Sequence, residues 1–275
     1  MRFQFWRDAL SAIYAGDKPV PQHPVALALA DVRRHRPVMK YYLSQLIEVR
    51  VSRVCVWVVG ADDLFSPDHL PALLAPRNRT RRTRSARARA QAKALSAPPA
   101  APSLDTYLSE HTIPSALLQG SLPLLLPPSD EGTSHIAHTL SHVAHLLSIT
   151  SLLHSLAPMV HKKQLPIPAD VRAQHGVVEE DVFRNGSAAE GFKDAVFTIA
   201  TRGMDELITA RTDLKKDGGK VVPKAAMPLF LSAVPAERFL KRLEDVDFDV
   251  FAPELHKHDW KLAPSIWWRY QSDKL

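Results

Sequence analysis

The chain has 275 residues, a net charge of +6 at pH 7, and 45% hydrophobic residues. This composition is typical of one large globular domain or two small ones, and it excludes a wholly disordered or fibrous chain. The single cysteine, Cys55, excludes an internal disulfide and a zinc site built on cysteine pairs. No uninterrupted apolar run approaches the roughly 18 residues that span a bilayer, so we expect no transmembrane helix.

Apolar residues at helical spacing predict three short helices near the N-terminus. The first covers Trp6 to Tyr14 and ends at Gly16. The second runs from Pro24 to Pro37, and the third from Met39 to Ile47. Three consecutive helices indicate an all-α fold.

Residues 51–102 break the helical pattern. Prolines are followed by a run from Arg77 to Lys93 that contains eight positive charges and no acid. The run could bind the phosphates of RNA or anionic lipid, but without interleaved aromatic residues a solvated or disordered segment is the better interpretation. We therefore divide the chain into N-terminal helices (1–50), an irregular basic and proline-rich insert (51–102), and the remainder of one helical domain (103–275).

Helical spacing returns after the insert. No strand pair and no internal repeat is recognisable in the sequence. The glycines at 218 and 219 fit the C-terminal end of a helix. The predicted helices cover Leu104–Leu126, Ser134–His154, Ala188–Lys215, Lys224–Ala233, Ala236–Asp245 and Ala263–Gln271.

Four histidines form a ridge on one face of the second of these helices, because they are spaced by three, four and three residues. Two of them could bind zinc, but no acid lies between Glu131 and Asp170 to complete or orient a site. We therefore predict a polar or partner-facing ridge and no metal. The ridge consists of His135, His138, His142 and His145.

Two acidic groups are interpreted as structural. Asp213 and Asp217 flank a lysine pair at a predicted helix end, where a solvated last turn is expected. The acids Asp245, Asp247 and Asp249 lack the glycine and the distal glutamate of a calcium loop. The residues that alternate with them are expected to pack against the core: Val246, Phe248, Val250 and Phe251.

No nucleophile is indicated, because Cys55 lies in the irregular segment and the serines lack a GxSxG elbow. An aromatic signature near the N-terminus instead resembles squalene and phytoene synthases, which share an FW…Y…HPV order of residues. Its members in this chain are Phe5, Trp6, Tyr14, His23 and Pro24.

A later segment, from Leu147 to Pro168, resembles the second aspartate-rich motif of the same family but lacks its acids. The two family aspartates correspond to Ser155 and Met159, and the arginine before them to His154. The basic pair that follows is kept as Lys162 and Lys163.

In active synthases, carboxylates hold Mg²⁺ against a diphosphate leaving group. A hydroxyl or a thioether does not replace a carboxylate for this hard cation. The resemblance therefore implies an isoprenoid-synthase-type bundle of helices around a cavity, without catalysis and without a cofactor. The alternative is a Mg²⁺-dependent prenyltransferase that uses isoprenoid diphosphates and relies on an intact aspartate motif upstream of this sequence.

The C-terminal half resembles more specifically a branch of the family that assists assembly of mitochondrial respiratory complex I. This implies association with assembly intermediates or other assembly factors at the matrix side of the inner membrane, with peripheral membrane contact and no specific nucleic acid. The segments that carry the resemblance are His175–Val177, Lys193–Phe197, Val222-Pro223, Phe239–Lys241 and, most specifically, the run with Asp247, Phe248, Asp249, Phe251 and Pro253.

Compared with the family, the chain has an additional segment after its third predicted helix and is expected to lack an N-terminal part. Relatives join the third helix to the helix at Leu104 by a short connection, and Val51-Ser52 can be encoded as GTGAGT, a splice-donor consensus. We hypothesise that residues 51 to about 84 derive from a retained intron, which sequencing of spliced transcripts tests. Met1 matches an internal methionine of relatives, so we expect an N-terminal truncation, with a transit peptide and further helices upstream.

Overall fold

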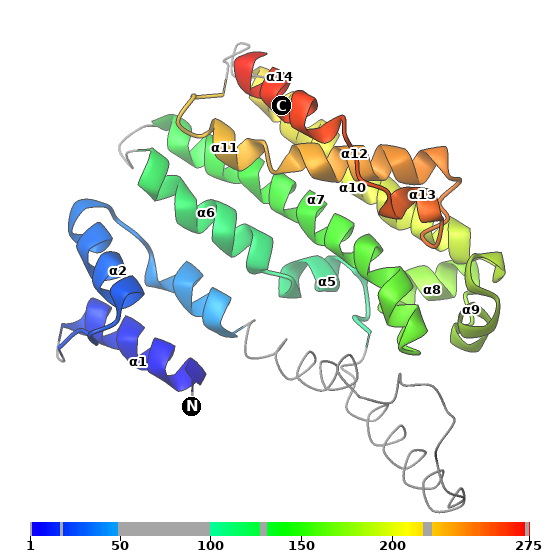
Figure 1. The fold of residues 1–275 in the computed structure, drawn as a ribbon, viewed down its shortest axis with the longest axis horizontal. Helices are drawn as coiled ribbons and strands as arrows, with labels where there is room; N and C mark the ends of the chain where they lie inside the picture. The colour runs from blue at the N-terminus through cyan, green and yellow to red at the C-terminus, as the bar shows by residue number, and fades with distance from the viewer. Residues whose placement is uncertain (1, 17–18, 49–99, 127–130, 217–221, 273–274) are drawn as a thin grey trace, which may run out of the picture. The chain divides into compact units, whose positions relative to one another are not determined.

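In a computed structural model of the chain, the described residues are 2–16, 19–48, 100–126, 131–216, 222–272 and 275. Across these ranges every regular element is a helix and no strand occurs, which confirms the predicted all-α class (Figure 1). The arginine-rich run and the retained-intron segment lie outside the described residues and stay predictions.

The helices follow one another along the chain, and a helical segment over residues 40–48 continues the first two. The labelled elements are α1 (Arg2–Ala15), α2 (Pro24–His35), α5 (Leu104–Glu110), α6 (Ile113–Leu125), α7 (Glu131–His161), α8 (Ala169–His175), α9 (Glu179–Asn185), the 3-10 turn η2 (Gly186–Ala188), α10 (Phe192–Lys216), α11 (Met227–Phe230), α12 (Ala233–Asp245), α13 (Pro253–His256) and α14 (Leu262–Ser272).

Helix α7 lies at the centre of the core. It packs along α10 and against α6 and α12, so it is apolar on several faces (Figure 1). The stretch Ser134–His161 is long and apolar enough to cross a membrane, and 61% of its apolar window is buried inside the protein. Its place in the core accounts for that composition, and the expected absence of a membrane span stays a prediction. Its fully buried side chains include Leu140, Leu146, Ile149 and Leu156.

A glycine allows the central helices to approach closely. A Cβ atom on Gly203 of α10 would lie 3.0 Å from Ile149 Cγ2 of α7 and 3.2 Å from Leu240 Cδ1 of α12. These separations are tighter than ordinary van der Waals contact, so a larger residue would require the Ile149 and Leu240 side chains to shift. The register of α7 against α10 is therefore set near the middle of both helices.

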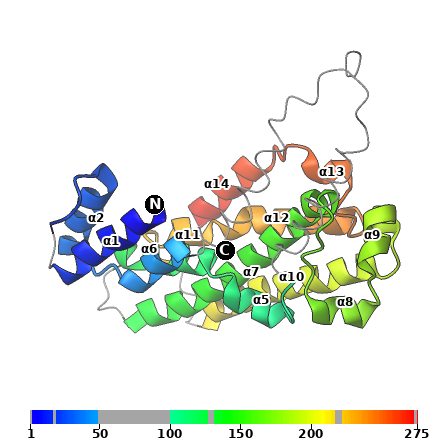
Figure 2. The same cartoon turned by 90° about the horizontal axis from the view of Figure 1, so that it is seen from below.

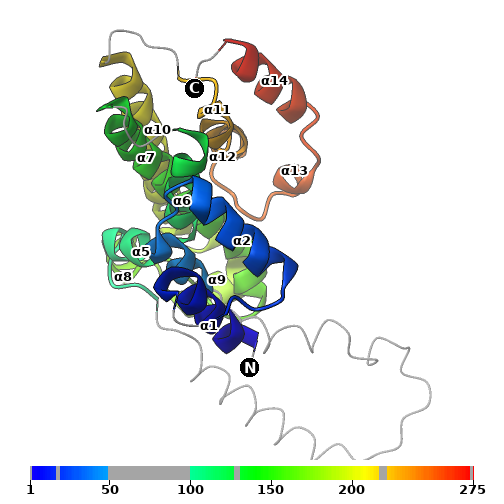
Figure 3. The same ribbon diagram turned by 90° about the vertical axis from the view of Figure 1, so that its left-hand side faces the viewer.

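The smaller helices lie at one end of this core and along one side of it (Figure 1). Helices α8 and α9 lie near the start of α10 (Figure 2). Helices α13 and α14 pack on α12, on the side that faces away from α7 (Figure 3). A cavity among the helices, which the family resemblance implies, stays a prediction.

The predicted helix over Leu104–Leu126 is wrong in one respect, because the chain forms two helices with a break at His111 and Thr112. Pro114 lies in the first turn of α6, where its missing N–H needs no partner, so it starts a new helix. Ser103 caps α5, accepting a 3.1 Å hydrogen bond from the Thr106 N–H.

Other helix bounds also differ from the prediction. Helix α7 continues through Pro158 to His161, beyond the predicted end at His154. Helices α8 and α9 were not predicted, because seven residues show too little periodicity. Both end at glycines with positive φ, Gly176 at 64° and Gly186 at 60°.

Candidate functional site

The residues predicted to form a degenerate aspartate motif lie on the last turns of α7 and directly after its end at His161. The His154 ring stacks on Phe239 of α12, with centroids 3.7 Å apart. The Ser155 hydroxyl donates a 2.7 Å hydrogen bond to the Leu152 carbonyl of its own helix. The Met159 carbonyl accepts hydrogen bonds from the Lys162 and Gln164 N–H groups and so ends the helix. These contacts are ring packing between α7 and α12 and hydrogen bonds within and at the end of α7.

The motif end of α7 offers no carboxylate to a cation. Two groups of three or more potential metal ligands occur among the residues that the structure describes, and neither includes a motif position. Lys162 and Lys163 are exposed, and Lys163 has a φ of 57° just past the helix. A hydroxyl that hydrogen-bonds within its own helix and a thioether are poor ligands for Mg²⁺.

The N-terminal signature residues contact one another. The Trp6 and His23 rings meet edge to face with centroids 5.0 Å apart, and Phe5 lies 5.8 Å from His23. His23 also caps α2 by accepting a hydrogen bond from the Val25 N–H, with Pro24 in the first turn. The sequence spacing alone did not show that the two halves of this signature meet.

Tyr14 ties the N-terminal helices together. Its hydroxyl donates a 2.7 Å hydrogen bond to the Val38 carbonyl, and the Arg33 guanidinium lies 4.4 Å above its ring. Burial raises the pKa of the Tyr14 hydroxyl, more than the nearby Arg33 charge lowers it. Tyr14 therefore has a structural role.

The two C-terminal signature segments also meet in space. Lys193 Nζ of α10 lies 2.8 Å from Asp247 Oδ2, and the Phe197 and Phe248 rings meet edge to face with centroids 5.0 Å apart. Phe251 stacks on Phe192, with centroids 5.8 Å apart. The segment from Val246 to Pro253 therefore attaches the end of α12 to the start of α10.

The alternation around Asp247 is confirmed as a packing pattern. Val250 is buried, and Val246, Phe248 and Phe251 pack against the core. Asp247 and Phe248 have φ values of 54° and 55°, and Asp249 Oδ1 accepts a 2.9 Å hydrogen bond from the Phe251 N–H. Pro253 then begins α13.

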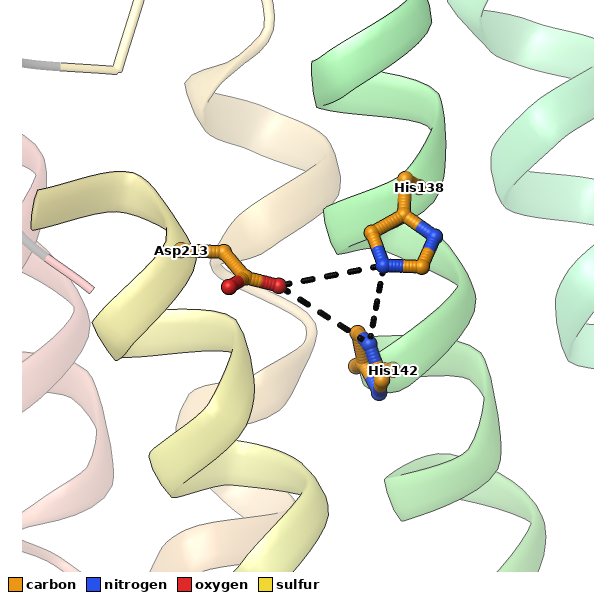
Figure 4. Close-up of side chains that lie close together, drawn as sticks. All are labelled: His138, His142 and Asp213. Atoms are coloured by element: carbon orange, nitrogen blue, oxygen red, sulfur yellow. Dashed lines mark hydrogen bonds and ion pairs between the residues drawn. The ribbon is translucent and has the colours of Figure 1, made fainter. Parts of the chain in front are cut away.

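The opposite end of α7 carries the histidine ridge, and there α10 supplies carboxylates. Figure 4 shows His138 and His142 of α7 pointing toward Asp213 of α10. His142 Nδ1 lies 2.6 Å from Glu206 Oε2, and His145 Nδ1 lies 3.5 Å from Glu206 Oε1. The prediction that no acid completes the ridge considered only the local sequence, and tertiary packing brings two acids there.

Glu206 is buried and ionised. Burial raises the pKa of its carboxyl, but hydrogen bonds from His145 and His142 and the charges of His145 and Arg202 outweigh it and lower the pKa to about 2. Arg202 Nη2 lies 3.0 Å from Glu206 Oε1, one turn earlier on α10. The carboxylate is therefore placed to accept a hydrogen bond from the His142 imidazole at neutral pH.

The expected solvated position of Asp213 is wrong, because the residue is 9% exposed and faces the ridge. Asp217 lies outside the described residues. One signal in the sequence could have paired the helices: Glu206 and Asp213 are seven residues apart, as are His138 and His145. Seven residues are about two helical turns, so each set lies on one face of its helix.

A comparison with models of protein families matches residues 1–265 to squalene/phytoene synthases. The chain belongs to this family. The match covers residues 1–265, and the correspondence of Ser155 and Met159 to the aspartates of the family's second motif stays a prediction.

Several curated relatives share one name, NADH dehydrogenase (ubiquinone) complex I, assembly factor 6. The rat protein is 29% identical over 272 residues, which is 98% of this chain and 66% of the relative. The human protein is 27% identical over 257 residues, 94% of this chain and 61% of the relative. A Drosophila melanogaster homolog is 30% identical over 109 residues, 39% of this chain and 31% of the relative. The chain thus spans less than two thirds of the length of the first two relatives.

Proposed function

We propose that this chain is a non-catalytic member of the squalene/phytoene synthase family that acts in assembly of mitochondrial respiratory complex I. The observation that carries the non-catalytic part is the replacement of the second motif's carboxylates by Ser155 and Met159. Their hydroxyl and thioether do not hold Mg²⁺ against a diphosphate. The names of the rat and human relatives support the role in assembly.

The proposal places the protein in mitochondria, at the matrix side of the inner membrane, with complex I assembly intermediates or other assembly factors as partners. The chain has a surface that is suited to peripheral contact with a membrane. Trp260, Trp267 and Trp268 are 72%, 60% and 68% exposed, although tryptophan side chains are usually well covered in globular proteins. Exposed tryptophans of this kind favour the interface between lipid headgroups and acyl chains.

Basic side chains accompany these tryptophans. Lys241 and Lys261 line a pocket of about 550 Å³ between α12 and α14, together with the three tryptophans. Lys261 Nζ lies 5.4 Å from the centroid of the Trp260 ring. Cationic groups beside interfacial aromatic rings favour an anionic lipid surface, so we assign membrane contact to α14 and the loop before it.

Complementation tests the assembly role. Cells deleted for the gene are supplied with the chain, fused to a matrix-targeting leader, and complex I is resolved on native gels. We expect loss of complex I on deletion and equal rescue by the chain and by a double variant, Ser155→Ala with Met159→Ala. Normal complex I in the deleted cells, together with Mg²⁺-dependent consumption of farnesyl diphosphate by the purified protein, would establish the prenyltransferase alternative.

Vesicle flotation tests the membrane surface. The double variant Trp267→Ser with Trp268→Ser should bind anionic vesicles roughly tenfold more weakly than the unmodified chain, because both changes remove interfacial apolar area. Tyr41→Ser is the matched control, since Tyr41 is 64% exposed on a different helical segment. Equal binding by all three proteins would remove α14 as the contact.

A further inference from the structure

Three side chains at the histidine end of α7 form a compact group apart from the family motif. His142 Nε2 lies 3.4 Å from His138 Nε2, and each of these nitrogens lies 3.9 Å from Asp213 Oδ2. His142 and Ser155 are thirteen residues apart on one helix, which corresponds to about 20 Å along its axis. The group is therefore remote from the positions at which the synthases hold Mg²⁺.

The spacing of the three atoms suits an ion better than hydrogen bonds. A contact of 3.9 Å between nitrogen and oxygen is too long for a hydrogen bond. A triangle with sides of 3.4, 3.9 and 3.9 Å has a circumradius of about 2.2 Å, so one point lies at that distance from all three atoms. Zinc lies roughly 2.0–2.1 Å from imidazole nitrogen and 2.0–2.2 Å from carboxylate oxygen.

A buried carboxylate sets the orientation of the central ligand. Glu206 Oε2 lies 2.6 Å from His142 Nδ1, a distance at which a carboxylate oxygen accepts a hydrogen bond from the Nδ1 hydrogen. In neutral His142 the lone pair is then on Nε2, the atom that faces His138 and Asp213. A carboxylate that accepts from the outer nitrogen of a ligating histidine is a recurrent feature of zinc sites.

A second arrangement, in which His142, His145 and Glu206 hold the ion, is less suitable. Glu206 Oε1 already faces the Arg202 guanidinium at 3.0 Å, and its Oε2 accepts from His142. A divalent cation there would lie next to the arginine charge. Glu206 is thus better placed to orient His142 than to bind metal.

We infer that His138, His142 and Asp213 form a binding site for a divalent transition-metal ion of the zinc type, with Glu206 as the positioning residue for His142. The His138 side chain is 64% exposed and those of His142 and Asp213 are 20% and 12% exposed, so solvent reaches the site from one side. Three protein ligands and an exposed side leave a fourth position for water. Imidazole ligands favour zinc over magnesium.

Equilibrium dialysis of the untagged, chelator-treated chain against Zn²⁺ tests this inference, with bound zinc measured by elemental analysis. We expect one zinc ion per chain, retained in excess Mg²⁺. His138→Gln should abolish this binding. Because the His138 side chain is exposed, a loss of binding in this variant would not be due to misfolding. Glu206→Gln should weaken binding about 10- to 100-fold, as loss of an outer carboxylate does at zinc sites.

Two matched controls separate this site from adventitious binding. Asp205→Asn removes an exposed carboxylate next to Glu206 on α10, and His258→Gln removes an exposed histidine between α13 and α14. Neither residue belongs to the proposed site, so both variants should bind zinc with unchanged affinity. Two histidines one helical turn apart, such as His138 and His142, can bind zinc weakly by themselves. The affinity of such binding would not change when Glu206 or Asp213 of α10 is replaced. Unchanged affinity in both Asp213→Asn and Glu206→Gln would therefore overturn the proposal, as would the absence of bound zinc.

Discussion

The two ends of helix α7 differ in the side chains that they could offer to a metal ion. At the C-terminal end, where the sequence resemblance puts the aspartates of the family, Ser155 makes a helix-internal hydrogen bond and His154 stacks on Phe239. At the other end, His142 meets two carboxylates that come from α10. We interpret the first end as a cation site that has lost its carboxylates, whereas the second end brings together potential metal ligands from two helices.

This difference shows that the local sequence can indicate the replacement of a motif residue. It does not reveal a group of side chains that forms only when two helices pack together. A motif predicts which residue type stands at each of its positions, so replacement of a carboxylate, as we propose at Ser155 and Met159, can be predicted from the sequence. A new site assembled from two helices requires that both be packed in the correct register. That register depends on contacts such as Gly203 against Ile149.

The largest effect on stability is expected in the middle of α7, between the two ends compared above. Ile149→Ala should lower the free energy of unfolding by about 3 kcal/mol, because it leaves a cavity at the crossing of α7 and α10. Ile149→Val, which removes less volume, should cost about 1 kcal/mol. Urea unfolding at pH 7 measures both, and equal costs for the two variants would show that the site relaxes.

A smaller effect is expected at the histidine end. Glu206→Gln, measured with a chelator present, should lower the free energy of unfolding at pH 7 by about 2 kcal/mol, because it weakens charge-assisted hydrogen bonds. The pKa of Glu206 is lowered from 4.5 to about 2, so its contribution is complete above about pH 5 and is lost as the pH falls toward 2.

The stability difference between the unmodified chain and the Glu206→Gln variant should therefore shrink between pH 4.5 and pH 2. Denaturant unfolding at a series of pH values gives this difference directly. Asp205→Asn serves as the control, since it removes an exposed acid one residue away. A difference that stays constant down to pH 2 would contradict the assigned hydrogen bonds.

The smallest effect is expected at the motif end. Ser155→Ala should change the free energy of unfolding by no more than about 0.5 kcal/mol, because the lost hydrogen bond is internal to the helix and alanine favours helix formation. Thermal unfolding followed by circular dichroism is sufficient to measure this. A loss well above 1 kcal/mol would give Ser155 a structural role comparable to that of Glu206.

The sequence by itself determined the all-α class and the presence of the long helices α7 and α10, although α7 extends to His161, beyond its predicted end at His154. These features are local, because helical periodicity and residue identity need no knowledge of distant contacts. It also identified the packing residues around Asp247. It missed α8 and α9 and the break before α6, where seven-residue segments and one proline decide the outcome.

Only the tertiary structure decided which separate segments meet. Lys193 pairs with Asp247 across 54 residues, and His142 meets Glu206 across 64 residues. Asp213, expected in solvent, is buried against the histidine ridge because α10 packs along α7. Packing of apolar faces sets this alignment, and the polar groups carried on the same helices are brought together as a result.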